Sequence, residues 1–139
     1  MDGRIDHVVL WVQDMQRSLD FYRNVMELEG VRIDEFYAGK APFPSVRVSA
    51  DSIIDLMPPG SKSGTEELTR ADGTAGFPVN HLCLALSRSD FDALIARLEK
   101  NGIDTSARLK QSFGACGLAP NTVYFRDPDN NVIEARYYE

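Results

Sequence analysis

Four side chains suited to metal binding or acid–base chemistry recur at matching positions in the two halves of this sequence. The chain has only two histidines, and both precede a short apolar run: His7 in DHVVLWV and His81 in NHLCLAL. Each half also carries one carboxylate inside an apolar strand candidate, Asp55 in SIIDLMPP and Glu134 in NVIEARYY. In each half the acid follows its histidine at nearly the same separation along the chain. The sequence therefore pairs one imidazole with one carboxylate twice.

The alternation of strand side chains predicts where these groups point. Successive residues of a strand face opposite sides of its sheet. The aliphatic residues that alternate with the two histidines are expected to pack under a helix: Val8, Leu10, Val12, Leu82, Leu84 and Leu86. Both histidines are therefore expected on the helix-free face.

The donor set predicts a divalent metal centre. Two imidazoles and one or two carboxylates suit Fe(II), Mn(II), Ni(II), Co(II) or Zn(II). Taken singly, a strand histidine is more often a hydrogen-bonded core residue, but burying two unpaired carboxylates is costly and favours a cation. We predict that His7, His81 and Glu134 bind one metal ion and leave positions open for water and substrate. Asp55 is predicted to be either a fourth ligand or a free base beside the metal.

The elements that must position these residues form a repeat. A strand over Ile5–Val12 leads through Asp14, a good N-cap, into a helix that Gly30 is expected to end. A strand over Val79–Leu86 leads in the same way into a helix capped by Ser89 and ended by Gly102. Three further strands are expected in each half: Val31–Tyr37, Ser45–Ala50 and Ser52–Met57, then Thr105–Gln111, Thr122–Arg126 and Val132–Tyr138.

The chain is thus predicted to be one α+β domain, residues 1–139, made of two βαβββ modules. The modules are residues 1–58 and 79–139. The segment between them, 59–78, is rich in Gly, Pro, Ser and Thr and is expected to be a linker loop or a lid. Asp127–Asn131, DPDNN, is a turn between the last two strands. Ser112–Gly117 is interpreted as a flexible loop.

Composition narrows the class of partner. The chain has 139 residues, 43% hydrophobic and 26% charged, with a net charge of −6. The absence of a basic stripe argues against nucleic acid or an anionic membrane as partner. No apolar run approaches a membrane span and the N-terminus lacks a signal-peptide layout, so a cytoplasmic protein with a small-molecule substrate is expected. The two cysteines show neither metal-site nor redox spacing.

At these residues the chain resembles the vicinal oxygen chelate superfamily, also called the glyoxalase/bleomycin-resistance/extradiol-dioxygenase superfamily. The resemblance covers almost the whole chain and rests on IDHVVLWVQDMQRSLDFYRNVMEL, NHLCLAL and YFRDPDNNVIEARYY. It implies a curved, cup-shaped mixed sheet built from paired βαβββ modules, a divalent metal in the cup, and a substrate that chelates it through vicinal oxygens. It also implies that His7, His81 and Glu134 are the ligands, that Asp55 matches a fourth-ligand position, and that the protein is a homodimer.

Departures from the family pattern rank the possible reactions. Extradiol dioxygenases carry a further histidine before the tyrosine, and the corresponding segment SFGACGLAPNTVYF has none. Glyoxalase-like lyase or isomerase chemistry is therefore favoured over ring-cleaving dioxygenation. A thiol transferase of the fosfomycin-resistance type and a non-catalytic drug- or metabolite-binding protein remain alternatives. Asn130 replaces the usual glycine of the turn, and asparagine tolerates the positive φ needed there.

Two further residues are predicted to act in catalysis. Arg136 shares the face of Glu134 and would either stabilise an anionic substrate oxygen or form a salt bridge with Asp55 or Glu134. Tyr124 would donate a hydrogen bond or a proton to a bound oxygen, or serve as an ordinary aromatic strand residue.

Overall fold

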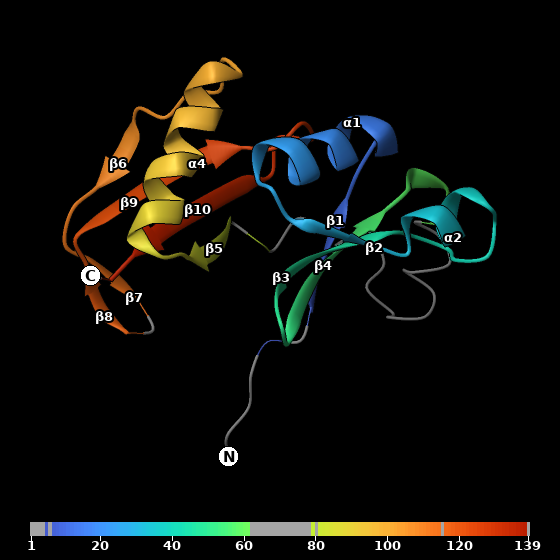
Figure 1. Cartoon of the computed structure of the whole chain (residues 1–139), viewed down its shortest axis with the longest axis horizontal. Helices are drawn as coiled ribbons and strands as arrows, with labels where there is room; N and C mark the ends of the chain where they lie inside the picture. The colour runs from blue at the N-terminus through green and yellow to red at the C-terminus, as the bar shows by residue number, and fades with distance from the viewer. Residues whose placement is uncertain (1–4, 6, 62–78, 80, 115, 139) are drawn as a thin grey trace. The chain divides into compact units, whose positions relative to one another are not determined.

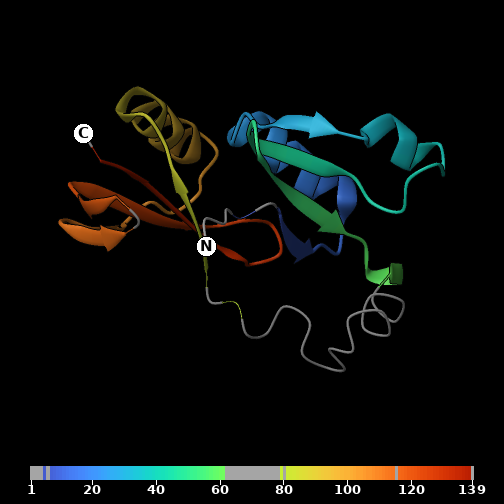
Figure 2. The same ribbon diagram turned by 90° about the horizontal axis from the view of Figure 1, so that it is seen from below.

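A computed structural model describes residues 5, 7–61, 79, 81–114 and 116–138 of the chain. It divides into two compact units, Met1–Pro78 and Val79–Glu139. Figure 1 shows the helices and strands of each unit, and Figure 2 shows them from below. Most of the expected linker loop, 59–78, falls outside the described residues, which include only its first part as a short 3-10 turn at Pro59–Ser61.

The first unit contains one four-stranded mixed sheet. Its strands have the order β1-β4-β3-β2, with β1 parallel to β4 and the other pairs antiparallel. In chain order the elements are β1 (His7–Trp11), α1 (Met15–Asp20), the π-helical segment η1 (Phe21–Val25), β2 (Glu29–Val31), α2 (Ile33–Tyr37), β3 (Ser45–Ser49) and β4 (Ser52–Met57).

The second unit repeats this topology. Its sheet has the order β5-β10-β9-β6, again with one parallel pair, β5 and β10. The elements are β5 (His81–Ala85), α4 (Arg88–Lys100), β6 (Ala107–Leu109), β7 (Ser112–Gly114), β8 (Gly117–Ala119), β9 (Asn121–Arg126) and β10 (Val132–Tyr137). Figure 2 shows α4 over one side of its sheet. The predicted α+β fold with two βαβββ modules is confirmed, as two four-stranded mixed sheets with helices.

The helices begin at caps that the sequence largely indicates. The Asp14 carboxylate accepts a hydrogen bond from the Arg17 amide at 3.0 Å, as its N-cap position predicts. The prediction for the second helix was two residues off, because the Ser87 hydroxyl, not that of Ser89, accepts from the Asp90 amide at 3.1 Å. Gly102 ends α4 with a φ of 69°.

The end of the first helical segment differs from the expectation. Gly30 lies in β2 rather than at a helix end. The helical segment closes at Met26, whose amide donates to the Phe21 carbonyl at 3.1 Å, and Glu27 takes the positive φ of 57° that follows. A π-helical turn over Phe21–Val25 shifts the end of the helix away from the glycine.

Each unit buries the helix face that periodicity selects. In the first unit the buried helical side chains include Leu19, Tyr22 and Met26. In the second unit Phe91, Leu94 and Leu98 of α4 are buried, and α4 contacts β10. Burying these apolar faces is the main stabilising contribution of both helices.

Two local predictions were wrong. The segment Val31–Tyr37 is not one strand: β2 ends at Val31, and Ile33–Tyr37 forms the short helix α2. Arg32 sets this break with a φ of 57°, and its guanidinium donates to the Phe43 carbonyl at 3.2 Å. The segment predicted as a flexible loop forms the two-stranded hairpin β7–β8, in which Ser112 pairs with Ala119.

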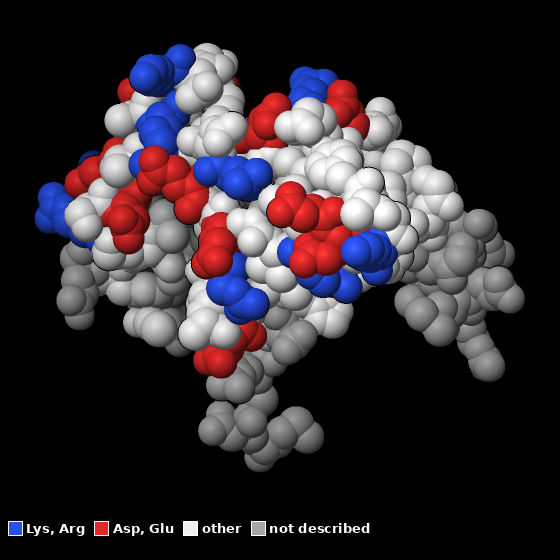
Figure 3. All heavy atoms as spheres, turned by 45° about the vertical axis from the view of Figure 1, so that its right-hand side comes forward, with Lys and Arg blue, Asp and Glu red and all other residues white. Residues whose placement is uncertain are grey.

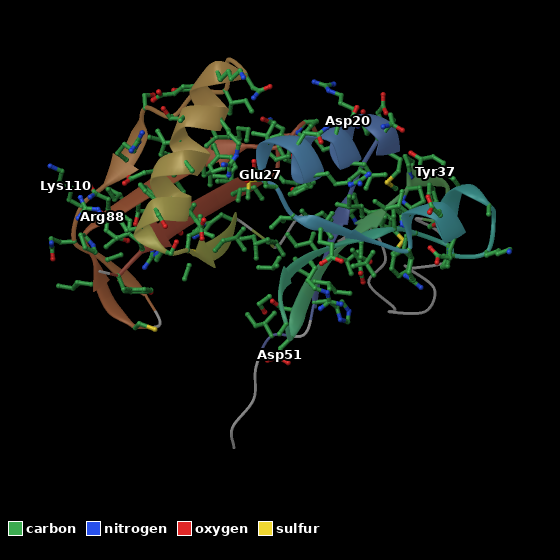
Figure 4. All side chains as sticks on the ribbon, in the orientation of Figure 1. Asp20, Glu27, Tyr37, Asp51, Arg88 and Lys110 are labelled. Carbon is green, nitrogen blue, oxygen red and sulfur yellow. The ribbon has the colours of Figure 1, made fainter. Side chains whose placement is uncertain are left out.

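The helix α2 is tied to α1 by a side-chain hydrogen bond. The Tyr37 hydroxyl donates to Gln16 Oε1 at 3.1 Å, and Gln16 Nε2 donates to Asp20 Oδ1 at 2.8 Å. Figure 4 labels Asp20 on α1 and Tyr37 at the end of α2. The contact between Tyr37 and Gln16 joins residues far apart in sequence and helps to explain why a β-branched and aromatic segment is helical here.

Candidate functional site

The sheet registers place each histidine and its acid equivalently in the two units. In the first unit His7 pairs with Ile53, so Asp55 lies two residues further along the neighbouring parallel strand. In the second unit His81 pairs with Val132, and Glu134 lies two residues further along. The register thus gives the duplicated pattern a geometric basis: in both sheets the imidazole and the carboxylate share one face of adjacent strands.

Exposure along the first strand of each unit follows the predicted alternation. His7 and Val9 are exposed, whereas Leu10 is buried. In β5, His81 and its alternate neighbours are exposed, whereas Leu84 is buried. Both histidines therefore lie on the face opposite the buried aliphatic side chains.

In the second unit the predicted ligands meet. His81 Nε2 lies 3.0 Å from Glu134 Oε2, and the Glu134 side chain is only 2% exposed while that of His81 is 37% exposed. Tyr124 pairs with Glu134 across β9 and β10. Its ring stands perpendicular to the His81 ring, with 5.6 Å between the ring centroids. A buried carboxylate, an accessible imidazole and a phenol thus share one small region of the sheet.

Arg136 contacts the other oxygen of the Glu134 carboxylate. Its Nη2 forms an ion pair with Glu134 Oε1 and donates a hydrogen bond to the same oxygen. The same guanidinium donates to the Ser112 hydroxyl at 3.1 Å and to the Ser112 carbonyl at 3.4 Å. The hydrogen bond with Glu134 raises the pKa of Arg136 above its already high ordinary value. Of the roles predicted for Arg136, the observed contact is the salt bridge with Glu134.

The surroundings of Glu134 shift two other acidic groups. Partial burial, followed by the negative charge of Glu134, raises the pKa of the Tyr124 phenol. The Cys83 thiol is accessible, yet partial desolvation and the Glu134 charge raise its pKa to about 11. Both groups therefore keep their protons at neutral pH.

In the first unit the acid is held by a hydroxyl. Asp55 is 6% exposed, and its Oδ1 accepts a 2.6 Å hydrogen bond from the Ser45 hydroxyl. Ser45 is fully buried and pairs directly with Asp55 across β3 and β4. It stands where Tyr124 stands in the second unit, since each pairs with the acid of its own module.

The second unit fits part of a metal site. A carboxylate and an imidazole whose donor atoms lie 3.0 Å apart are the two ligand types that divalent transition metals combine. Within the described part of either unit, no three His, Cys, Asp or Glu side chains gather closely enough to hold an ion. His7 and Asp55 belong to the first unit, so the predicted ligand set draws on both units.

Two serines, one in each unit, contact the groups described above without a sequence pattern that marks them. Ser45 and Ser112 are small polar residues in strand segments, and neither has a spacing that marks it. Their importance appears only through contacts across the fold, with Asp55 in one unit and Arg136 in the other. The only sequence feature that relates to them is the repeat, because Ser45 and Tyr124 occupy equivalent positions opposite the acids of the two modules.

The charged surface and the lengths of the helices can be described directly. Figure 3 shows basic and acidic side chains interspersed on the visible face rather than gathered into a basic stripe. No helix in the described part of the chain is long and apolar enough to cross a membrane.

Comparison with known families decides the relationship. The profile of the Glyoxalase/Bleomycin resistance protein/Dioxygenase superfamily matches residues 4–135. The chain belongs to this superfamily. Members of the superfamily bind small-molecule substrates, typically use a divalent metal, and include lyases, isomerases and dioxygenases.

Relatives within the superfamily are distant. The chain is 27% identical over 135 residues to the glyoxalase domain-containing protein RDO1 of Mycosarcoma maydis, covering 97% of this chain and 68% of that protein. A virulence protein from Salmonella typhimurium has a similar structure, with a TM-score of 0.72, 22% identity and coverage of 100% and 99% of the two chains. A lactoylglutathione lyase from Agrobacterium tumefaciens gives a TM-score of 0.67 at 22% identity, covering 99% and 95%. These similarities support the glyoxalase-like fold.

Proposed function

We propose that this protein is a divalent-metal-dependent enzyme whose small substrate chelates the metal through two vicinal oxygens. Lyase or isomerase chemistry of the glyoxalase type is the reaction that we favour. We also propose that the protein is a homodimer located in the cytoplasm. The observation that carries the proposal is the contact between His81 Nε2 and Glu134 Oε2 at 3.0 Å. Both side chains lie on the face of the sheet where the sequence repeat predicts the ligands.

The proposed metal ligands are His81 and Glu134 from the second unit and His7 from the first. His7 is chosen because its register with β4 is equivalent to that of His81 with β10. Bound there, the metal would supply Lewis-acid polarisation of the two substrate oxygens. Iron, nickel, zinc, manganese and cobalt all suit this ligand set.

The protein's own groups would then handle protons. Asp55, fixed through Oδ1 by Ser45, is proposed either as a fourth ligand or as the base. As the base, its Oδ2 would take a proton from the hydroxyl-bearing carbon next to the polarised carbonyl and return it to the former carbonyl carbon. The hydroxyl proton would pass to the former carbonyl oxygen, so this isomerisation needs no other reactant. The Tyr124 phenol is protonated at neutral pH, since its ordinary pKa is already well above 7 and partial burial raises it further. It would donate a hydrogen bond to a substrate oxygen.

We place ring-cleaving dioxygenation below glyoxalase-type chemistry because the chain has too few histidines. Both histidines of the chain are already assigned as ligands, so none remains for acid–base work on a catechol. Cys116, which lies near the expected position of that histidine in sequence, is a poor replacement at neutral pH.

Metal content tests the proposal. Protein purified without chelator should contain close to one divalent ion per proposed site, measured by elemental mass spectrometry. The double variant His7→Ala with Glu134→Ala should lose it, because two of three ligands are removed. Glu99→Gln is a control for charge, since Glu99 is an exposed residue of α4 that accepts a hydrogen bond from Thr105 at 3.1 Å.

Metal content that stays unchanged in the double variant would contradict the proposed site. Turnover of hemithioacetals by the metal-loaded protein, with catechols unreactive, would support the favoured reaction. A metal-loaded protein that instead opens catechol rings would show that the reaction class is wrong while the site is right.

A further inference from the structure

The position of Arg136 suggests a role that differs from contact with a substrate. We infer that Arg136 is a positioning residue that holds Glu134 through one oxygen and weakens its hold on the metal, so that the bound ion is a stronger Lewis acid. The inference rests on the proposed metal site. It concerns how tightly that site binds its ion rather than whether it does.

A chain of contacts joins the hairpin β7–β8 to the proposed ligands. The Ser112 hydroxyl and carbonyl accept from the Arg136 guanidinium at 3.1 and 3.4 Å. Arg136 contacts Glu134 Oε1, and Glu134 Oε2 lies 3.0 Å from His81 Nε2. The Arg136 side chain is only 6% exposed, which leaves little of it for a substrate to touch.

The two oxygens of Glu134 therefore have different neighbours. Oε1 is taken by a guanidinium, and Oε2 faces the imidazole that would share the ion. Partners of a metal ligand usually orient it and tune its basicity. Arg136 differs from a neutral partner because arginine is always charged. Its positive charge lowers the electron donation from Glu134 and repels a nearby divalent ion, so it favours weaker binding and a more electrophilic metal.

The first unit shows that the fold does not require this cation. Arg136 pairs with Ala85 across β10 and β5, and Met57 pairs with Trp11 at the equivalent place. The acid of the first unit is held by the neutral Ser45 hydroxyl. A buried arginine beside the carboxylate is therefore specific to the module that contributes two of the three proposed ligands.

A neutral variant separates charge from shape. Arg136→Gln keeps a hydrogen-bond donor but removes the charge, and chelator-treated protein should then bind Zn(II) or Co(II) on the order of tenfold more tightly than the unaltered protein. Arg136→Lys restores the charge and should return the affinity to within about threefold of the unaltered protein. If the glutamine variant does not fold, Arg136→Met, which copies Met57, takes its place.

Arg126→Gln is the matched control. Arg126 is an exposed arginine of the adjacent strand β9, and its guanidinium donates to the Asn130 carbonyl at 3.1 Å. The same change of charge there should leave metal affinity nearly unaltered, because exposed charges are screened. Competition with a chromophoric chelator measures the affinity, and the rise in Tm on adding metal provides a second readout that should be larger for the neutral Arg136 variant.

The outcomes distinguish this inference from the function on which it rests. Unaltered protein that binds no divalent ion contradicts both. Binding that is unchanged or weaker in Arg136→Gln, or equally tightened in Arg126→Gln, contradicts the role of Arg136 alone. A merely structural arginine would weaken metal binding when replaced, so tighter binding in the neutral variant, with return in Arg136→Lys, supports the inference.

Discussion

The turn between β9 and β10 offers a direct test of how the site is positioned. Asp127 is 5% exposed, and its carboxylate accepts three hydrogen bonds within the turn. Oδ1 accepts from the amides of Asp129 and Asn131 at 2.9 and 2.8 Å, and Oδ2 accepts from Asn131 Nδ2 at 2.9 Å. Because this turn fixes the register that sets Tyr124 opposite Glu134, Asp127→Ala should loosen the site as well as the fold.

The expected loss of stability follows from these bonds. A hydrogen bond to a charged group contributes about 1.5–3 kcal/mol. The three are not additive, since they share one carboxylate and water can replace part of what is lost. We expect Asp127→Ala to lower the free energy of unfolding by about 3 kcal/mol. Asp127→Asn keeps an Oδ1 acceptor for both amides and should cost about 1 kcal/mol.

Urea unfolding followed by circular dichroism measures both changes, with the slope of the transition checked for constancy. Asp92→Ala, at an exposed position of α4, is the control for removing one negative charge and should stay within about 0.5 kcal/mol. A loss below about 1 kcal/mol for the alanine variant, or an equal loss for alanine and asparagine, would refute the account of the turn.

Two further predictions concern protonation. In chelator-treated protein with Cys116 replaced by serine, Cys83 should react with iodoacetamide at pH 8 roughly tenfold more slowly than an ordinary thiol. Its pKa of about 11 rather than 9.0 leaves much less thiolate, partly offset by the greater nucleophilicity of that thiolate; a rate equal to that of a free thiol would contradict this. Hydrogen bonds from Ser106 lower the pKa of Asp104, so carboxyl NMR should give a midpoint below 3.8 in the folded protein. Its contribution to stability is then present above pH 3.8 and is lost as the pH falls through the lower folded value, and a folded midpoint at or above 3.8 would exclude it.

The sequence by itself was sufficient for the duplicated fold and for the faces of its strands. Apolar residues at helical and strand periods selected the buried faces, because those periods are fixed by local geometry. The turn at DPDNN was also predicted, and Asn130 takes the positive φ of 69° expected of it. The N-cap at Asp14 was also predicted correctly, because helix capping depends on residues close together in sequence.

Only the tertiary structure decided which polar groups meet. The segment Ile33–Tyr37 has strand-forming residues but is helical, since the backbone of Arg32 and contacts with distant residues override local preference. The partners of the acids, Ser45 for Asp55 and Arg136 with Ser112 for Glu134, depend on strand register and on a hairpin that no periodicity announces. Sequence spacing predicted a histidine and a carboxylate in each module, and strand register places each pair on one face of its sheet. The charge and hydrogen bonding around each carboxylate arise from residues brought near it by folding.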